Sequence, residues 1–526
     1  MKTNKLFFYI SLMIFTCLGC ESFIEEDPRD IIAPENFFAN DSDARQGITG
    51  IYSVIKNNSI YGQAGLDNWY DNGVDIIEPN RTHPIFAVMG NYTLNEVTAD
   101  ASNQKMSVSD TWQNLYRVIL NANVIIDRVD GNAAISDAVQ ANVVANARFL
   151  RALAYWHITN LWGDAPFYTE VLTLEEISKL GRTGKDIILA SVLDDLEFAQ
   201  NNLPPSVLND QRGRASKWAA VMIEAKIHMQ AKRWQDGLDK CLEIINESPH
   251  TLLSTYADVF DPTNEYNSEI IWSLDFARDV TGQFEPAFPG AAFAGNNYWR
   301  PSLFNPRIRD EPANAADKDP LIAALKANGQ EFNGTGLQIA SKDFANKFPA
   351  NDLRRPLNIM DSYAGFPLNH TYLPKFMNLN FETSPRFNHG DNRIVFRLAD
   401  VHLMAAECEN ERPGGNPNDA FEYIRKIRER AYATQGEAEA IDGLSQTDFR
   451  EAIYDERKWE LAAEATRRLD LIRWGIYLDV VRNAEFKTYT PNLNIKDNHV
   501  LLPIPLNEIQ LNPNLLTSDP TNNGYR

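Results

Sequence analysis

One stretch, RASKWAAVMIEAKIHMQAKRWQDGLDKCLEIINES, constrains the fold of this 526-residue chain more than any other segment. It predicts a helix over about 215–231, a short turn near Lys232 and Arg233, and a second helix over about 234–247. Alanines and other small residues recur where the two helices would touch. A helical hairpin of this length is typical of tetratricopeptide-like repeats, although two ordinary antiparallel helices would give the same pattern.

Apolar residues spaced three or four apart predict helices elsewhere in the chain as well. These segments are 114–130, 142–161, 186–202, 397–431 and 447–482, of which 397–431 reads as a second hairpin around PGGNPN. Between about 251 and 395 the long periodic runs disappear, and Pro, Gly, Asn and aromatic residues crowd together. The sequence therefore predicts a mainly α fold that includes helical hairpins, with an irregular, loop-rich region between about 251 and 395.

The start of the chain predicts export and a lipid anchor. Two lysines precede an apolar run from Leu6 to Leu18, which is shorter than the ~20 residues that a transmembrane helix needs. The Gly19-Cys20 pair that follows resembles the end of a bacterial lipobox, in which the cysteine receives lipid and becomes the new amino terminus. An ordinary signal peptide cut near Gly19 is the alternative. We therefore expect a signal peptide over 1–19 and palmitate-type acyl chains on Cys20.

The composition excludes several classes of partner and site. A formal net charge of −21 repels nucleic acid phosphates, so we expect no nucleic acid partner. Cys241 and Cys408 lie in helical patterns and are predicted to be buried free thiols. No Cys/His spacing, HExxH, Walker loop or GxSxG motif occurs, so no metal or cofactor is predicted. The stretch DPTNEYNSE at 261–269 faintly resembles a calcium loop, but it lacks the glycine, and a solvated turn is favoured.

Charged residues crowd into the carboxyl-terminal helical pattern and into one arginine pair. The set is Arg148, Arg151, Glu456, Glu460, Glu464, Arg467, Asp470 and Arg473. Paired acids on one helix face would suit glycoside hydrolysis, in which two carboxyls flank the scissile bond. The neighbouring arginines would keep those acids ionised, which favours a structural ion network and no catalytic residue. Helical spacing also predicts pairs between Glu464 and Arg468 and between Asp470 and Arg473.

Several segments in combination resemble the SusD/RagB family of outer-membrane lipoproteins from Bacteroidetes. They are CESFIEEDPRD, NLYRVILNANVIID, NARFLRALAYWHITNLWGDAPFYTE, GRASKWAA, FRLADVHLMAAEC, AFEYIRKIRERA, DERKWELAAEATRRLDLIRWG and LLPIPLNEIQLNPNL. Two positions depart from the family pattern. Ala465 stands where glycine is usual and Arg425 where asparagine is common, and we expect both to lie in helices.

The resemblance implies four tetratricopeptide-like helix pairs with an irregular region packed on them. It also implies a non-catalytic receptor, lipid-anchored on the outer membrane, that binds glycan for polysaccharide utilisation and delivers it to a SusC-like TonB-dependent transporter. A RagB-like protein that binds peptide or another non-sugar nutrient is the alternative, and a tethered glycoside hydrolase is a third hypothesis. The expected regions are the signal peptide (1–19), a lipidated acidic tether (20–40), an amino-terminal helical region (41–250), an irregular ligand-binding region (251–395), and a carboxyl-terminal helical region with an extended tail (396–526).

Glycan binding predicts a further set of residues. Aromatic rings cover the C–H faces of a sugar, while Asn, Asp, Gln and Arg bond its hydroxyls. Two aromatic clusters stand in polar stretches without periodicity and are predicted to be exposed and to bind glycan: Trp69, Tyr70, Asp71 and Asn72 in the first, Asn296, Tyr298 and Trp299 in the second. Arg81, Phe284, Phe288 and Tyr363 are weaker members of the same set. The alternative is that these rings pin loops onto the scaffold.

Overall fold

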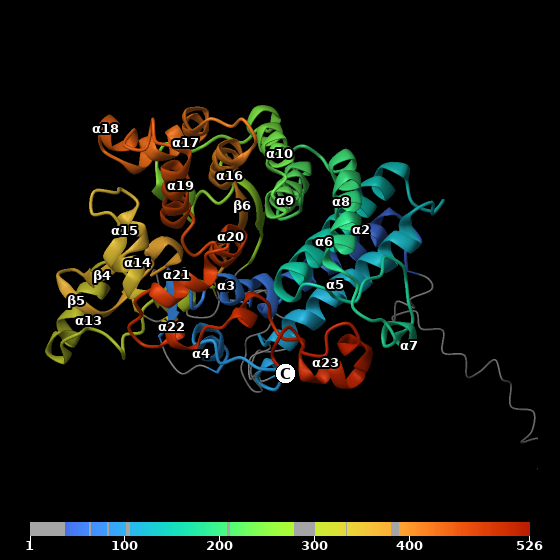
Figure 1. Cartoon of the computed structure of the whole chain (residues 1–526), viewed down its shortest axis with the longest axis horizontal. Helices are drawn as coiled ribbons and strands as arrows, with labels where there is room; N and C mark the ends of the chain where they lie inside the picture. Colours follow the sequence, from blue (N-terminus) through green and yellow to red (C-terminus); the bar gives the residue numbers. More distant parts are fainter. Residues whose placement is uncertain are drawn as a thin grey trace, which may run out of the picture.

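The computed structural model describes residues 37–526, except 63–64, 81–83, 101–105, 208–210, 278–299, 333 and 380–388. Helices dominate the described residues, and the predicted mainly α fold is confirmed. The longer helices are α2 (Asp41–Ile55), α5 (Val108–Val129), α6 (Asp137–Trp162), α8 (Lys185–Asn202), α9 (Lys217–Gln230), α10 (Trp234–Glu247), α16 (Leu398–Glu411), α17 (Pro417–Ala431) and α19 (Gln446–Glu460). Figure 1 shows α2, α5, α6 and α8 grouped on one side and α16, α17 and α19 on the other, with α9 and α10 between them.

Shorter elements connect and cover these helices. The short helices are α3 (Gly65–Tyr70), α4 (Pro84–Gly90), α7 (Leu174–Ile177), α11 (Tyr256–Val259), α12 (Arg300–Phe304), α13 (Lys318–Ala327), α14 (Lys342–Lys347), α15 (Arg355–Asn358), α18 (Gln435–Ala438), α20 (Arg467–Trp474), α21 (Tyr477–Asn483), α22 (Pro491–Asn494), α23 (Leu506–Leu511) and the 3-10 helix η6 (Pro374–Phe376). The strands are β1 (Ile77–Pro79), β2 (Ile270–Leu274), β3 (Gln338–Ala340), β4 (Met360–Tyr363), β5 (Phe366–Tyr372) and β6 (Arg393–Arg397).

Both predicted hairpins are present, one made by α9 and α10 and the other by α16 and α17. Because α10 also packs on α16, the two hairpins meet, and α5, α6 and α8 continue the stack on the α9 side. Gly237 of α10 lies at this junction. A Cβ added there would stand 3.0 Å from Cys408 Sγ and 3.2 Å from Met229 Cγ, so a larger residue would force these two side chains to shift by a few tenths of an ångström. Neighbour-to-neighbour packing of helix pairs is the arrangement of a tetratricopeptide-like stack.

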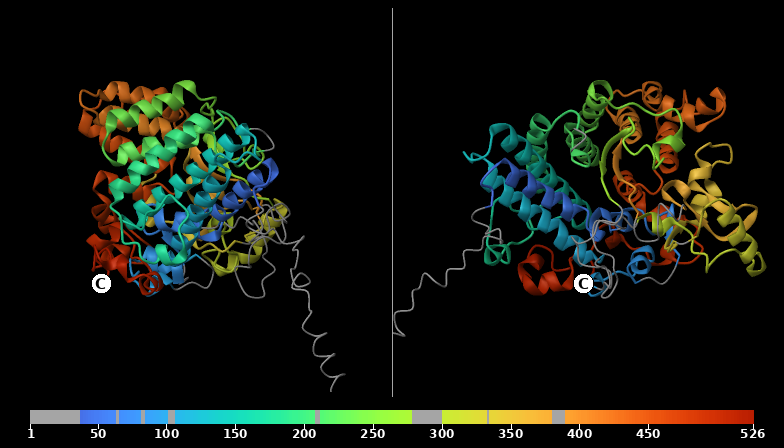
Figure 2. Two further views of the ribbon diagram at one scale, coloured as in Figure 1. Left: turned by 90° about the vertical axis from the view of Figure 1, so that its right-hand side faces the viewer. Right: turned by 180° about the vertical axis from the view of Figure 1, so that it is seen from behind.

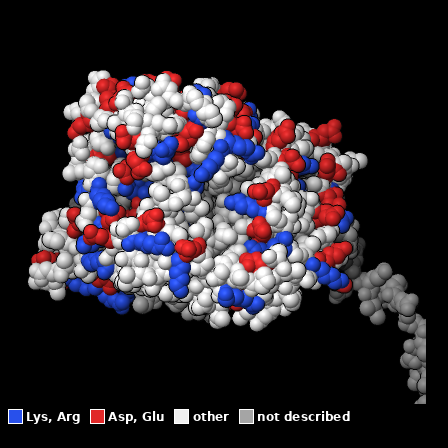
Figure 3. Space-filling model, in the orientation of Figure 1, with Lys and Arg blue, Asp and Glu red and all other residues white. Residues whose placement is uncertain are grey.

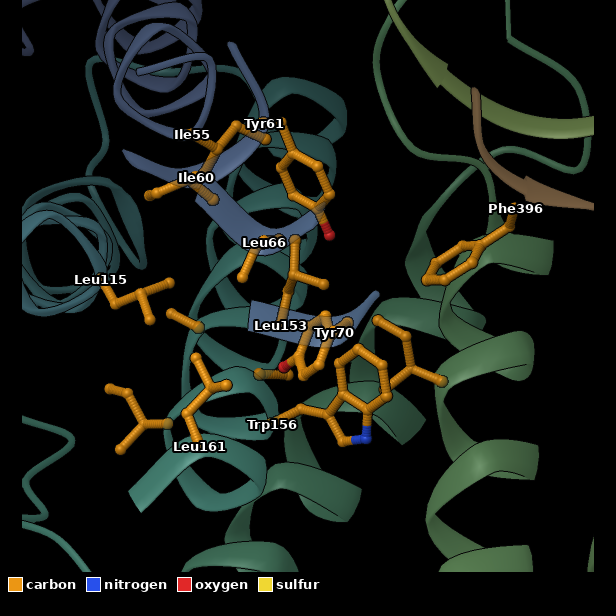
Figure 4. Close-up of a cluster of buried hydrophobic side chains, with 14 of the residues drawn as sticks. Ile55, Ile60, Tyr61, Leu66, Tyr70, Leu115, Leu153, Trp156, Leu161 and Phe396 are labelled. Atoms are coloured by element: carbon orange, nitrogen blue, oxygen red, sulfur yellow. The ribbon is translucent and has the colours of Figure 1, made fainter. Parts of the chain in front are cut away.

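The main hydrophobic core joins this stack to segments from other parts of the chain. Tyr61 and Tyr70 lie against α6, from which Leu153 and Trp156 project into the same cluster, as Figure 4 shows. Phe396 of β6 belongs to the same core, although it lies far along the sequence. The core therefore fixes strand β6 against the amino-terminal helices.

The irregular region is built from small antiparallel pairs, namely β1 with β3, β2 with β6 and β4 with β5. The first pair ties residues 338–340 to the amino-terminal part of the chain. Figure 2 shows the short elements between residues 300 and 380 gathered at one end of the molecule, away from α5, α6 and α8. Figure 3 shows acidic and basic side chains mixed over one face of the whole body.

The predicted helical stretch 447–482 is interrupted, which corrects two expectations. Helix α19 ends at Glu460 and α20 begins at Arg467, and in the link Ala463 and Ala465 both have φ of 61°. Ala465 therefore does not lie in a helix. Its left-handed conformation strongly favours glycine, which gives a physical reason for a glycine at that position. Arg425 does lie in a helix, α17, as expected.

Two further findings concern the cysteines and the possibility of membrane-spanning helices. Cys241 and Cys408 are buried free thiols, as predicted. In the portion of the chain that the structure describes, no helix combines the length and apolar character that crossing a bilayer would require.

Candidate ligand-binding cleft

The first predicted aromatic cluster lies in the core, so the expectation that it is exposed is wrong. Trp69 and Tyr70 close helix α3 and are each 1% exposed. The Trp69 indole donates to Thr111 Oγ1 at 2.9 Å, and the Tyr70 hydroxyl lies 3.0 Å from Nδ1 of His157. A helix of six residues is too short to show periodicity, and α3 is buried along its whole length.

The polar residues that follow α3 are also used inside the protein. Asp71 accepts hydrogen bonds from the backbone N–H groups of Ala465, at 2.6 Å, and Arg467, at 3.1 Å. Burial, reinforced by the charge of Asp67, raises the pKa of Asp71 to about 7. Asn72 donates to Asn68 Oδ1 and to the carbonyl of Phe86. Asp71 therefore holds the link before α20 next to α3, and Asn72 joins α3 to α4, which matches the alternative in which these residues hold the scaffold together.

Among the other residues predicted to bind glycan, only Tyr363 lies in the part of the chain that the structure describes. Cys20, Arg81, Phe284, Phe288, Asn296, Tyr298 and Trp299 lie outside the described residues, so their roles stay predictions. Tyr363 lies half-buried in β4, where its hydroxyl bonds to Gln330 and accepts from Asn328.

Asp67 was not among the predicted site residues, and it joins three segments of the chain. Arg393 donates to both of its carboxylate oxygens at 2.6 Å, and Arg300 Nε donates at 2.7 Å. Burial opposes ionisation of Asp67, but the two guanidiniums lower its pKa below the ordinary value. Arg300 begins α12 and Arg393 begins β6, so Asp67 fixes the starts of both elements next to α3.

Next to these fixed points the described residues form a cleft of about 570 Å³, including its open mouth. Its walls come from α11 and the turn after it, α12, η6 and β6. The lining residues are Val259, Phe260, Asp261, Pro262, Glu265, Pro301, Lys375, Phe376, Met377, Asn378, Asp391, Asn392 and Ile394.

Two half-buried aromatic rings form one wall of the cleft. The centroids of Phe260 and Phe376 are 5.6 Å apart in an edge-to-face arrangement. The Arg300 guanidinium lies 3.6 Å from the centroid of Phe376, and Lys375 Nζ lies 4.6 Å from that of Phe260. Lys375 also donates to the carbonyl of Glu460 at 3.0 Å. The aromatic wall is therefore held by buried cations behind it.

Carboxyl and amide groups supply the polar part of the cleft. Burial, with the nearby charges of Asp391 and Asp275, raises the pKa of Glu265 to about 7, and burial raises the pKa of Asp391 as well. The backbone N–H of Asn392 donates to Glu265. Near neutral pH Glu265 therefore exists in both forms, and it can accept or donate a hydrogen bond. Rings beside such groups suit a ligand with apolar faces and many hydroxyls.

The faint calcium-loop resemblance at 261–269 corresponds to a turn and an ion pair. Asp261 Oδ1 accepts from the backbone N–H and the hydroxyl of Thr263, both at 2.8 Å. Glu269 is fully buried and pairs with Arg397 and Arg430. Its carboxylate is therefore used by the protein itself.

All eight charged residues singled out in the sequence make ion pairs. The pairs are Arg148 and Arg151 with Asp195, Glu456 with Arg354 and Arg428, Glu460 with Arg354, Arg397 and Arg430, Glu464 with Arg397 and Lys375, Arg467 with Asp75, Asp470 with Arg457 and Arg473, and Arg473 with Glu407. The predicted pair of Asp470 and Arg473 is thus present at 2.9 Å. The predicted pair of Glu464 and Arg468 is wrong because the helix is interrupted, and Arg468 donates instead to the carbonyls of Trp69 and His499.

Glu460 lies at the centre of this network. Its carboxylate accepts from Arg354 at 2.9 Å and from Arg397 and Arg430 at 2.7 Å each. Burial disfavours the charge, but the three guanidiniums lower the pKa of Glu460 well below the ordinary value. An acid that is held ionised in this way does not donate a proton at neutral pH, which argues against a general-acid role for Glu460.

The stacked helix pairs define a class of protein, the tetratricopeptide-like helical scaffold, and here the scaffold carries a cleft at its side. A model of the SusD family matches residues 351–525, and a model described as starch-binding associating with outer membrane matches residues 41–229. A SusD-like protein of Formosa agariphila is 63% identical over the full length of both chains. The chain belongs to the SusD family.

Solved structures show the same fold at low sequence identity. A SusD homolog from Bacteroides thetaiotaomicron superposes with a TM-score of 0.74 and 20% identity, covering 92% of this chain and 97% of that one. Surface glycan-binding protein A from Bacteroides thetaiotaomicron, in complex with laminarihexaose, gives a TM-score of 0.71 and 20% identity, covering 92% of this chain and 100% of that one.

Proposed function

We propose that this protein binds a glycan at the cell surface without cleaving it and delivers it to a SusC-like TonB-dependent transporter. The observation that carries the proposal is the cleft, where Phe260 and Phe376 stand beside the carboxyl and amide groups of Glu265, Asn378 and Asp391. Such a wall covers the C–H face of a sugar while the polar groups bond its hydroxyls. The laminarihexaose complex of a protein with the same fold supports a glycan as the ligand class.

The location follows from the amino terminus under the same proposal. The apolar leader 1–19 exports the chain, acyl chains on Cys20 hold it on the outer membrane, and the acidic tether 20–40 keeps the body clear of the headgroups. The family description, which associates such proteins with the outer membrane, supports this placement.

A soluble form lacking residues 1–20 tests binding and chemistry together. We expect affinity electrophoresis and titration calorimetry to detect binding to a member of a neutral and charged glycan panel, with no new reducing ends after prolonged incubation. Release of shortened products would overturn the non-catalytic role. Retention of peptides with no glycan bound would favour the RagB-like alternative.

Two substitutions test whether the ligand binds in the cleft. We expect Phe260→Ala to weaken glycan affinity about fivefold, because one stacked ring is lost, and Asn378→Ala to weaken it by a similar factor. Asn418→Ala, on the exposed start of α17, serves as the matched control and should change nothing. Unchanged affinity in folded Phe260→Ala and Asn378→Ala proteins would reject the cleft, and Trp299→Ala then tests the remaining predicted cluster.

A further inference from the structure

Most of the charged side chains that line the cleft are acids. The described part of its lining holds the carboxyl groups of Asp261, Glu265 and Asp391, with Lys375 as the basic side chain beside them. Asp261 stays ionised at neutral pH, because the backbone N–H and the hydroxyl of Thr263 lower its pKa. Negative charge in a concave site repels anionic ligands and attracts cationic ones. The sign of the cleft therefore bears on which sugars can enter it.

Lys375 directs its hydrogen bonds toward the scaffold. Its ammonium donates to the carbonyls of Glu460, at 3.0 Å, and Ala462, at 3.1 Å, and to the carboxylate of Glu464. These three contacts use the three N–H donors that a lysine has. Burial lowers the pKa of Lys375 to about 8, so the ammonium depends on these partners to stay charged. Its donors are therefore already occupied when a ligand arrives.

Glu265 is affected mainly by burial and by other acids. Burial removes water from its carboxyl, and Asp391 and Asp275 add negative charge nearby, which together raise its pKa to about 7. The backbone N–H of Asn392 donates to Glu265 and opposes the shift. No cation takes part in this balance, and the interactions of Glu265 fall within the described residues. A cation brought by a ligand would therefore stabilise the ionised form of this carboxyl.

Asp275 stands between Glu265 and the nearest cations. It accepts from the hydroxyl of Tyr266 at 2.5 Å, and the charges of Lys56 and Arg212 favour its ionised form. Burial outweighs these contributions, and the pKa of Asp275 is raised. Lys56 and Arg212 thus act on Asp275 and do not contribute to the charge balance at Glu265.

Asp391 adds a second half-buried carboxyl to the same wall. Its Oδ1 accepts from the Asn378 amide at 3.4 Å, and Nδ1 of His389 lies 4.0 Å from its Oδ2. Burial raises the pKa of Asp391, which shows that these neighbours do not fully replace the water that it loses. Glu265 and Asp391 therefore share a region that favours added positive charge.

A sugar that carries an ammonium group suits both parts of the cleft. Its C–H face can pack on the rings of Phe260 and Phe376, and its ammonium can donate a charge-assisted hydrogen bond to Glu265. A sugar with a carboxylate or a sulfate ester brings a further negative charge into the same space. An N-acylated amino sugar brings no charge and gains neither effect.

We propose that Glu265 determines the specificity of the cleft, so that glycans with free amino groups bind more tightly than neutral ones and acidic glycans bind most weakly. The inference rests on the proposed function, because it names the class of glycan that the same cleft takes.

Titration calorimetry at pH 7 on the soluble form lacking residues 1–20 tests the proposal with three probes. They are an oligomer of glucosamine, its N-acetylated counterpart and an oligomer of glucuronic acid. We expect the glucosamine oligomer to bind about tenfold more tightly than the N-acetylated one, and the glucuronic acid oligomer to bind more weakly than either. Glu265→Gln keeps an acceptor for the Asn392 N–H but removes the charge, so the amine preference should fall to about twofold. Asp258→Asn, which removes an exposed charge of α11 outside the cleft lining, is the matched control and should keep the preference.

The pH dependence separates a direct contact from a structural role. Between pH 7 and pH 5.5 Glu265 takes up a proton, whereas the amine of the ligand stays charged. The affinity for the glucosamine oligomer should therefore fall with decreasing pH in the parent and stay level or rise in Glu265→Gln. Since burial disfavours the ionised carboxyl, Glu265→Gln should leave the urea midpoint at pH 8 unchanged or higher.

Three results would overturn the role of Glu265 while leaving the glycan receptor in place. They are equal affinity for the two glucosamine oligomers, tightest binding of the glucuronic acid oligomer, and an amine preference that survives in Glu265→Gln. The role would also be overturned if none of the three probes bound while another glycan of the panel did. If no glycan bound at all, the proposed function would fail, and this inference with it.

Discussion

The helix stack of α5 to α10 and the segment from 352 to 473 are held together by different forces. Inside the stack the buried positions are largely apolar, with Val118, Ile119 and Phe149 fully removed from solvent. In the later segment, buried arginines and acids stand beside an apolar cluster that includes Leu403, Phe421 and Phe449, and Arg354 is itself fully buried. Apolar packing loses stability in proportion to the atoms removed, whereas a buried ion network leaves an unpaired charge when one member is lost. The irregular region is therefore anchored by contacts that tolerate less change.

Glu460→Gln breaks the network at its centre and should have the largest effect. It leaves Arg354, Arg397 and Arg430 with one anionic partner fewer in a buried site. We expect a loss of roughly 3–5 kcal/mol in the free energy of unfolding, measured by urea denaturation. Glu429→Gln on the exposed side of α17 is the matched control and should change stability by less than about 0.5 kcal/mol. Equal effects of the two substitutions would contradict the role given to the network.

Trp69→Ala tests the apolar side of the comparison. The ring is 1% exposed and its indole donates to Thr111 on α5. Removing it should cost about 3 kcal/mol through the cavity left behind. A variant that kept its full thermal stability and lost only glycan binding would contradict the core position of Trp69.

His157 sharpens the comparison, because it is a polar group kept uncharged inside the stack. It lies between the hydroxyls of Tyr61 and Tyr70, and burial lowers its pKa to about 3. The unfolded state takes up a proton below about pH 6.5 and the folded state does not, so stability falls as the pH decreases. We expect the stability advantage of the parent over His157→Gln to shrink by about 2 kcal/mol between pH 7 and pH 5. Urea midpoints at several pH values measure this, and a constant gap would count against a neutral His157.

Ala465→Gly should have the smallest effect, since it removes a single half-buried methyl group and no ion pair. The left-handed conformation at φ of 61° costs alanine more than glycine, although glycine gains freedom in the unfolded chain. We expect a net gain of about 0.5 kcal/mol. Ala462→Gly, in the same link but without a positive φ, is the control and should lose stability. A loss in both would show that strain at Ala465 is negligible.

The two regions also differ in how far the sequence predicts them. Helices such as α5, α6, α9 and α10 follow from apolar spacing, because a long amphipathic helix repeats its signal over several turns. The break after Glu460 could not be read in this way, since the ERKWELAAEATRRLDL stretch stays compatible with a helix on both sides. The partners of Glu464 are Arg397 and Lys375, which lie far away in the sequence and carry no local spacing signal.

The residues of the candidate site could likewise not be predicted from local sequence patterns. Trp69 and Tyr70 sit in a polar stretch that is typical of an exposed loop, yet the stretch is a short helix buried on all sides. Phe260 and Phe376, which line the cleft, stand in unremarkable surroundings and meet only through tertiary packing. The acidic Asp67 was visible beside Trp69, but its arginine partners are brought to it by the fold.

Asp67 has a consequence for how the fold is assembled. It is bonded to Arg300, which lies 233 positions further along the chain, and to Arg393, which lies 326 positions further along. Contacts of such long sequence separation slow folding, because a large part of the chain must be closed into a loop before they form. A substitution at Asp67 would therefore disconnect elements from three distant parts of the sequence at once, and it would leave two buried guanidiniums without their common anion.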